Sequence, residues 1–143
     1  TNHTCGIQAD GTLWCWGQSM NGKLGNGTIT PDVLAPAQIG SSRWNSVSAG
    51  GDSTCGIQAD NTLWCWGIAT GGVLGNGTTT PDVTAPVQIG SSKWLHVDTR
   101  WRSSCGIQED GSLWCWGEAL NGKLGNGSTI PNRTTPVRVR SGE

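Results

Sequence analysis

Residues 12–17 read Thr-Leu-Trp-Cys-Trp-Gly, and this stretch decides the fold because the chain contains it in three copies. Residues 62–67 repeat it without change, and residues 112–117 differ only in beginning with Ser. The copies are 50 residues apart each time. A fixed period of this size is typical of stacked or radial repeat architectures. We therefore expect one repeat array whose last repeat is incomplete. The expected repeats span 1–50, 51–100 and 101–143.

The charge of the chain argues against a nucleic-acid partner, and its apolar pattern argues against a membrane span. Only 13% of the 143 residues are charged and the formal net charge is -1, so the chain lacks the basic field that a nucleic-acid partner requires. No run of 18 apolar residues occurs, and we expect no membrane-spanning helix. The sequence opens with neither an initiator Met nor a signal peptide, so we expect a processed chain or a piece of a longer one.

All nine aromatic residues of the chain are Trp. Six of them belong to the repeated Trp-Cys-Trp motif, and a bulky side chain that recurs with the repeat is expected to pack in its core. The predicted packing residues are Trp14, Trp16, Trp64, Trp66, Trp114 and Trp116.

Each copy of the motif forms the second half of an expected β-hairpin. In repeat one, two short β-type runs at residues 4–8 and 12–16 flank a turn signal at residues 9–11. We interpret the turn as a three-residue loop whose last residue adopts a left-handed conformation. That residue is Gly11 in repeat one and Asn61 in repeat two, the two residue types that accept a positive φ most readily.

This loop sets the register of the hairpin. Cys5 then lies opposite Cys15, and Gly6 lies opposite Trp14, whose indole is expected to cover the glycine. Directly opposed residues of an antiparallel pair are close enough for a disulfide bridge, whereas a two-residue loop would place the cysteines on opposite faces. We predict one disulfide in each hairpin. The predicted pairs are Cys5–Cys15, Cys55–Cys65 and Cys105–Cys115.

The sequence leaves other states of the cysteines open. Buried free thiols are the main alternative to disulfides. Zinc is disfavoured, because the chain has no Cys-x-x-Cys motif and its two histidines, His3 and His96, do not recur with the cysteines. We expect no metal and no cofactor. Regular cysteine pairing indicates an oxidising compartment, so we expect a secreted or extracellular protein.

The remainder of each repeat predicts two further strands. In repeat one, a Gly- and Asn-rich connection at residues 21–28 precedes a strand-like run at residues 37–39, and a fourth run follows at residues 44–48. Four short strands per 50 residues, with turns between them, are typical of a β-propeller blade. The predicted fold is therefore all-β, an array of about three four-stranded blades that is part of a larger propeller or assembles into one.

Several stretches of the repeat resemble the repeat of the regulator of chromosome condensation family. In repeat one they lie at residues 3–7, 10–17, 22–27 and 36–39. The resemblance covers essentially the whole chain in all three copies, and it implies a β-propeller of seven blades. Three blades cannot close such a ring. We expect either a longer array or several chains, with open sheet edges completed by neighbouring strands.

The sequon Asn-x-Ser/Thr recurs at the same place in every repeat, within the Gly-rich connection. In a secreted eukaryotic protein such sites are N-glycan acceptors on exposed loops. The alternative is that Asn-Gly serves the turn and the following Thr or Ser has no separate role. The predicted glycosylation sites are Asn26, Asn76 and Asn126 at the repeated position, with Asn2 and Asn132 outside it.

No group of residues has a spacing that indicates catalysis. His96 has no matching nucleophile, and Ser41 lies in a loop without a base at a fixed spacing. The Gly-rich residues 21–27 lack the Lys-Ser/Thr ending of a phosphate-binding loop. Asp10 and its equivalents in the other repeats are expected to serve the hairpin turns. We therefore expect no enzyme activity and no catalytic residue.

The expected function follows from the array and its cysteines. We expect a non-enzymatic extracellular structural or interaction protein, a glycosylated and polymeric scaffold that associates with itself or with neighbouring repeats and binds a protein or glycan partner. The resemblance implies two alternatives. One is a closed β-propeller binding module, either a protein inhibitor or a lectin-like protein. The other is a nuclear guanine-nucleotide exchange factor, which the paired cysteines and the lack of a basic tail disfavour.

Overall fold

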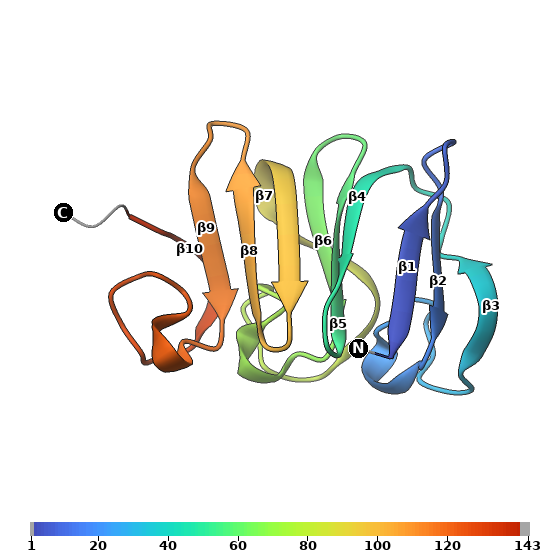
Figure 1. Ribbon diagram of the computed structural model, residues 1–143, viewed down its shortest axis with the longest axis horizontal. Helices are drawn as coiled ribbons and strands as arrows, with labels where there is room; N and C mark the ends of the chain where they lie inside the picture. The colour runs from blue at the N-terminus through green and yellow to red at the C-terminus, as the bar shows by residue number, and fades with distance from the viewer. Residues whose placement is uncertain (1, 141–143) are drawn as a thin grey trace.

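The computed structural model describes residues 2–140, and its regular elements are β-strands and short 3-10 turns (Figure 1). The strands are β1 (His3–Ile7), β2 (Leu13–Gly17), β3 (Val33–Gln38), β4 (Trp44–Ala49), β5 (Ser53–Gln58), β6 (Thr62–Gly67), β7 (Val83–Arg100), β8 (Ser103–Gln108), β9 (Leu113–Gly117) and β10 (Arg133–Arg138). The 3-10 turns are η1 (Met20–Gly22), η2 (Thr70–Gly72) and η3 (Leu120–Gly122). The prediction of an all-β fold is confirmed. Residue 1 and residues 141–143, at the outer limits of the expected repeats, lie outside the described range.

The hairpins β1–β2, β5–β6 and β8–β9 have the predicted three-residue loop. In the first, the Gln8 N–H donates to the Thr12 carbonyl at 3.0 Å, and the Gly11 N–H donates to the Gln8 carbonyl at 2.9 Å. The last loop residue has a φ of 84° at Gly11 and 67° at Asn61, as the exchange of Gly for Asn predicted. The resulting register matches the prediction and recurs in all three hairpins.

A short chain of hydrogen bonds closes each turn. The Asp10 carboxylate accepts from the Thr12 N–H at 3.0 Å and from the Thr12 hydroxyl at 2.6 Å. The hydroxyl oxygen in turn accepts from the Trp14 ring N–H at 2.9 Å. The bonds from Thr12 lower the pKa of Asp10, because they stabilise the charged carboxylate. The same chain recurs at Asp60 and Asp110, so these carboxylates serve the turns.

The expectation that this Trp covers the opposed glycine is wrong. The Trp64 ring N–H donates to the Thr62 hydroxyl at 2.8 Å, and this bond holds the indole toward its own hairpin loop. The indole that covers Gly56 is that of Trp44, since a Cβ built on Gly56 would lie 2.8 Å from the Trp44 ring. The third blade repeats this arrangement. The covering ring therefore comes from the preceding strand, which a single hairpin cannot reveal.

The antiparallel sheets correspond to propeller blades (Figure 1). The second blade contains β4, β5, β6 and the first half of β7. The third blade contains the second half of β7 with β8, β9 and β10. The first sheet contains β1, β2 and β3 among the described residues. Residues 44–50, which the sequence assigned to repeat one, therefore begin the second blade.

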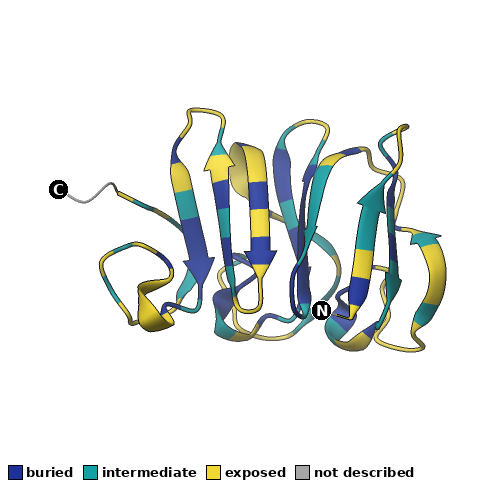
Figure 2. Cartoon of the chain, in the orientation of Figure 1, coloured by how far each residue is buried: buried dark blue, intermediate teal, exposed yellow. Residues whose placement is uncertain are grey.

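The first strands of neighbouring blades lie side by side. On β4, the Ser48 hydroxyl donates to the Asp98 carboxylate of β7 at 3.0 Å and accepts from the Thr99 N–H, also at 3.0 Å. The opposite edge of the first sheet, β3, is largely exposed (Figure 2). Each blade therefore has an inner edge that contacts its neighbour and an outer edge that faces solvent, as in a propeller.

Much of the core lies between blades rather than within one sheet. One buried cluster joins Leu13 and Leu24 of the first blade to Trp44 and Trp66 of the second. The rings of Trp44 and Trp66 meet edge to face, with centroids 5.7 Å apart and planes at 66°. The next interface repeats this geometry with its own Trp pair. Contact between blades therefore supplies apolar burial that one blade alone lacks.

Alanine at Gly56 is expected to lower the free energy of unfolding by about 1–3 kcal/mol. The added methyl group would lie 2.8 Å from the Trp44 ring and 3.0 Å from the Ser46 carbonyl oxygen. Gly6 is the matched control, because a Cβ built there meets no atom within 4 Å. Gly6→Ala is expected to change the free energy by less than about 0.5 kcal/mol. Urea unfolding measures both, and equal effects would contradict the role given to Trp44.

Candidate interaction site between blades

Each hairpin contains a disulfide at the position that the register predicts. The bridges join Cys5 to Cys15, Cys55 to Cys65 and Cys105 to Cys115. The paired Cα atoms are 4.1, 4.1 and 4.0 Å apart, respectively. Within residues 2–140 no cysteine is free. These three bridges indicate an oxidising environment.

Removing the disulfide of the second blade is expected to lower stability by about 2–3 kcal/mol, because the bridge restricts the unfolded chain. The variant replaces both Cys55 and Cys65 with Ala, so that no unpaired thiol remains. The matched control makes the same change at Cys5 and Cys15, where Cys5 is only half-buried. This control is expected to lose less packing and to show a smaller fall in melting temperature. Equal melting temperatures for the wild type and the Cys55/Cys65 variant, without reductant, would refute the prediction.

The six predicted packing residues have two different roles. The second Trp of the motif reaches the preceding blade: the Trp66 ring N–H donates to the Lys23 carbonyl at 3.0 Å, and the Trp116 ring N–H donates to the Val73 carbonyl at 2.9 Å. Both side chains are fully buried, whereas their counterpart Trp16 is half-buried. The first Trp of each motif stays at its own hairpin. These half-buried residues are Trp14, Trp64 and Trp114.

The Gly-rich loop of each blade contacts the next blade. The Lys23 carbonyl accepts from the Thr54 hydroxyl at 2.8 Å, and the Gly27 N–H donates to the Thr84 carbonyl at 2.8 Å. Gly22 permits this approach, because a Cβ there would lie 2.7 Å from the Thr84 Cα. The second loop makes the same contacts one blade later. Sequence reasoning identified these loops only as connections, although their recurring glycines were a signal for close backbone contact.

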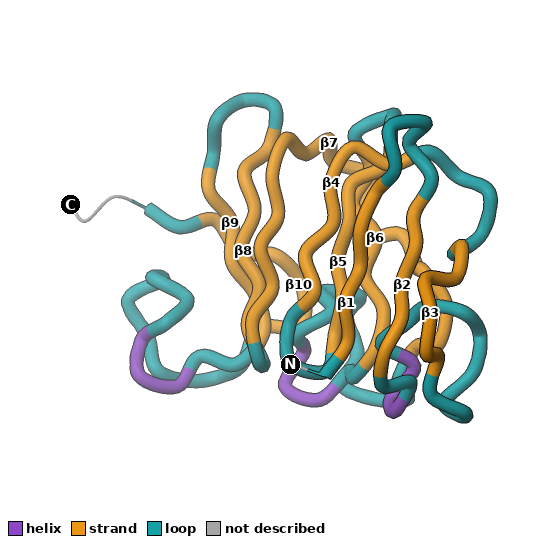
Figure 3. Tube along the Cα trace, turned by 45° about the vertical axis from the view of Figure 1, so that its right-hand side comes forward, coloured by secondary structure: helices purple, strands orange, loops and turns teal. Residues whose placement is uncertain are grey.

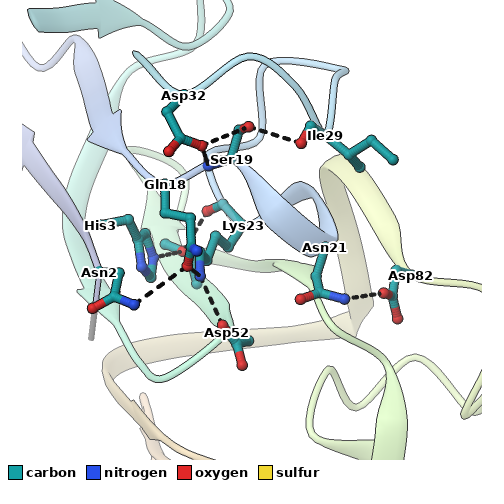
Figure 4. A network of polar contacts seen from close by, with 11 residues as sticks. Asn2, His3, Gln18, Ser19, Asn21, Lys23, Ile29, Asp32, Asp52 and Asp82 are labelled. Carbon is teal, nitrogen blue, oxygen red and sulfur yellow. Dashed lines mark hydrogen bonds and ion pairs between the residues drawn. The ribbon is translucent and has the colours of Figure 1, made fainter. Parts of the chain in front are cut away.

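A polar network occupies the first interface (Figure 4). Lys23 is 1% exposed, and its ammonium group donates to the Asp52 carboxylate at 2.7 Å and to the Gln18 amide oxygen at 2.6 Å. His3 lies beside it, with Nε2 2.8 Å from the Thr54 hydroxyl oxygen. Burial, followed by the nearby Lys23 charge, lowers the pKa of His3 to about 4. The first interface therefore holds a buried lysine beside a neutral imidazole.

The second interface carries different residues at these positions. Val73, Ser53 and Arg102 stand where the first interface has Lys, His and Asp. Sequence reasoning missed the network because it followed the residues present in all three repeats. Lys23 returns only as Lys123 in repeat three, and His3 and Asp52 do not return at equivalent positions. The available signal was that the positions of His3, Lys23 and Asp52 all carry a different residue one repeat later.

The loops that contain η1, η2 and η3 lie at one end of the sheets (Figure 3), and each repeated sequon follows its 3-10 turn in the sequence. Asn26 is exposed, and its side-chain oxygen accepts from the Thr28 N–H at 3.2 Å and from the Thr28 hydroxyl at 3.0 Å. Asn76 has the same bonds to Thr78, and Asn126 accepts from the N–H two residues later. The side chains therefore serve the turn. Glycosylation of these three residues stays a prediction.

The other two sequons differ from the repeated ones. The Asn2 amide donates to the Gln18 side-chain oxygen at 3.4 Å. The Asn132 side-chain oxygen accepts from the Ala119 N–H at 3.0 Å, and Asp82 makes the equivalent bond one repeat earlier. Asn132 therefore has a structural role in its loop. Glycosylation of Asn2 and Asn132 also stays a prediction.

The described side chains do not gather into a metal centre. In residues 2–140 no group of three His, Cys, Asp or Glu side chains is placed to hold a metal ion. In the same range, no helix has both the length and the apolar character that crossing a membrane requires. The expectations of no cofactor and no enzyme activity stay predictions.

The repeat itself matches a known family. The model of the regulator of chromosome condensation (RCC1) repeat matches residues 10–57 and 110–143. Together these ranges make up more than half of the chain. No sequence among the curated proteins matches it.

Solved structures share the fold at low sequence identity. A structure of Kap60 bound to yeast RCC1 (Prp20) matches with a TM-score of 0.88 and 19% identity, over 98% of this chain and 35% of that chain. Human WBSCR16 matches with a TM-score of 0.87 and 20% identity, over 98% and 38% of the two chains. The ectodomain of the Physcomitrella patens receptor kinase CR4 matches with 0.55 and 22%, over 91% and 30%. The predicted β-propeller blades are confirmed, and this chain spans about a third of the matched chains.

Proposed function

The chain belongs to the regulator of chromosome condensation (RCC1) repeat family, and we propose that it is a non-enzymatic extracellular structural protein whose blades associate head to tail with those of a second copy. The disulfides support a place outside the cell, because such bridges persist in oxidising compartments. A receptor ectodomain shares the fold, which fits the same location. One observation supports the assembly: among residues 2–140, the first blade and the third blade each present one half of the internal blade interface without a partner.

The first blade presents the half that receives a preceding loop. Trp16 corresponds to Trp66 and Trp116, which donate to carbonyls of the blade before them. Trp16 itself is half-buried. Thr4 corresponds to Thr54, which bonds the same loop carbonyl as Trp66, and Thr4 is exposed. The donors for another loop are therefore in place on this surface.

The third blade presents the other half, in loop residues 120–127. At the internal interfaces, a Cβ built on Gly25 or Gly75 would lie 2.7 Å from the indole nitrogen of the next blade. At Gly125 the nearest atom to such a Cβ is a side-chain carbon of Val139, at 3.2 Å. Among residues 2–140 no indole covers Gly125, and the Trp16 indole of a second copy would take this place if the Val139 side chain moved aside.

Association of this kind joins two different surfaces, so it either closes a ring or continues as an open polymer. The likeness to RCC1 propellers supports a curved arrangement of successive blades. A closed ring is the geometry of the alternative function, a propeller that acts as a binding module. An open polymer is the geometry of the scaffold. The size of the particle distinguishes the two.

Sedimentation velocity of the 143-residue chain tests the assembly. We expect particles larger than the 15.0 kDa monomer. Trp16→Ala removes one half of the contact. Gly125→Asn obstructs the other half, and Asn tolerates the φ of 64° at this position. Each variant alone is expected to be monomeric, whereas an equimolar mixture forms a 1:1 dimer through its one intact pair of surfaces.

Trp14→Ala is the matched control, because Trp14 bonds within its own hairpin. This variant is expected to assemble like the wild type. A wild-type chain that stays monomeric up to its solubility limit would overturn the proposal. A mixture of the Trp16 and Gly125 variants that stays monomeric would do the same, even if the wild type assembles.

A further inference from the structure

Grooves lie at equivalent places on the two blade interfaces. The groove between the first and second blades has a cavity volume of about 250 Å³, and the groove between the second and third has about 310 Å³. Gln58 and Trp64 line the first groove, and Gln108 and Trp114, one period later, line the second. The two grooves therefore share their lining because the repeated residues form them.

A buried Trp lines each groove. Trp44 lines the first groove and is 4% exposed, and Trp94 lines the second and is 1% exposed. Within the described residues, the ring nitrogens of both have no hydrogen-bond partner. A buried N–H without an acceptor is costly.

A second Trp presents an aromatic surface whose orientation is set in advance. Trp64 is half-buried, and its ring N–H is bonded to the Thr62 hydroxyl at 2.8 Å. Gln58 and Ser42 add an amide and a hydroxyl to the same groove. These groups both donate and accept hydrogen bonds. An ordered aromatic face loses little freedom when a ligand binds to it.

The lining of both grooves is uncharged. Neither set of lining residues includes Asp, Glu, Lys, Arg or His. A phosphate, a carboxylate or a nucleic acid would therefore find no opposite charge there. The lining favours a neutral ligand that has an apolar face and many hydroxyl groups.

We infer that these grooves bind neutral saccharides. The C–H face of a pyranose ring stacks on the indole of Trp64 or Trp114, and its hydroxyls bond to the amide of Gln58 or Gln108. The volumes lie near the lower limit of small-molecule sites, which is about 300 Å³, so each groove suits a short unit of a longer glycan. Both grooves can engage one polymer, which raises the apparent affinity. This inference goes beyond the proposed assembly and does not depend on it.

Calorimetric titration with cellohexaose, laminarihexaose and hexa-N-acetylchitohexaose tests the inference. We expect at least one of these neutral hexasaccharides to bind, and we expect the double variant Gln58→Ala/Gln108→Ala to weaken its binding by about 10-fold. Gln8→Ala is the matched control, because Gln8 is the equivalent residue of repeat one and lines neither groove. It is expected to leave the affinity unchanged.

Three outcomes would overturn the inference. The first is that none of the three hexasaccharides binds. The second is equal affinity for the wild type and the double Gln variant, provided that circular dichroism shows both to be folded. The third is that hexaproline, titrated as a peptide probe, binds while the saccharides do not, which would assign the grooves to an extended peptide.

Discussion

Replacing Trp66 with alanine is expected to lower the free energy of unfolding by about 3–5 kcal/mol, the largest effect predicted for this chain. Trp66 is fully buried, meets Trp44 edge to face and donates to the Lys23 carbonyl. The substitution would leave a cavity between two blades and would remove one donor from a buried carbonyl. Urea unfolding, followed by circular dichroism, measures the loss.

Trp16→Ala is the matched control, because Trp16 has the same place in its hairpin and is only half-buried. In protein dilute enough to be monomeric, this change is expected to cost about 1–2 kcal/mol, in proportion to the smaller apolar area removed from water. Equal losses at the two positions would show that the Trp packs within its own blade. The contact between blades would then not be the main source of burial.

Acidification from about pH 6.5 to about pH 4 is expected to destabilise the chain by about 2–3 kcal/mol through His3. Burial, and then the charge of Lys23, lowers the pKa of His3 from 6.5 to about 4, while Asp52 opposes the shift. Between these values the unfolded chain binds a proton that the folded chain does not bind. Stability therefore falls as the pH falls through this range. Below about pH 4 both states carry the proton, and the loss levels off.

The two histidines allow a direct comparison. His3→Gln is expected to remove this part of the pH dependence, because glutamine does not titrate. His96 is exposed, and His96→Gln is expected to retain the dependence. Thermal unfolding of both variants at a series of pH values from 4 to 7 measures the difference. A wild-type pH dependence that survives in the His3→Gln variant would refute the assignment to His3.

The hairpins could be predicted from the sequence because their geometry is local. The exchange of Gly11 for Asn61 indicated a left-handed loop residue, and the register that places Cys5 opposite Cys15 follows from that loop. Three internal copies tested the same interpretation in one chain. The number of strands in each 50-residue repeat also followed from turn and strand signals alone.

The contacts between blades could not be predicted in the same way. Trp44 covers Gly56 because strand β4 lies beside β5, and no hairpin pattern encodes which neighbouring strand supplies the ring. A search for residues shared by all three repeats does not select Lys23 or His3, since repeat two has Val73 and Ser53 at these positions. These roles depend on which strands and loops lie together in the folded chain. The 50-residue period therefore could not predict the contacts that differ between the two interfaces.

Because the blades are so similar, the surface that the second blade offers to the loop of the first blade is nearly repeated on the third blade. The loop of the first blade could therefore dock on either surface. The buried Lys23 distinguishes them. On the second blade it meets the Asp52 carboxylate at 2.7 Å, whereas the equivalent residue of the third blade is Arg102. Docking in the wrong order would bring two cations together, which is unfavourable. The Lys23–Asp52 ion pair therefore favours docking of the first loop on the second blade over docking on the third.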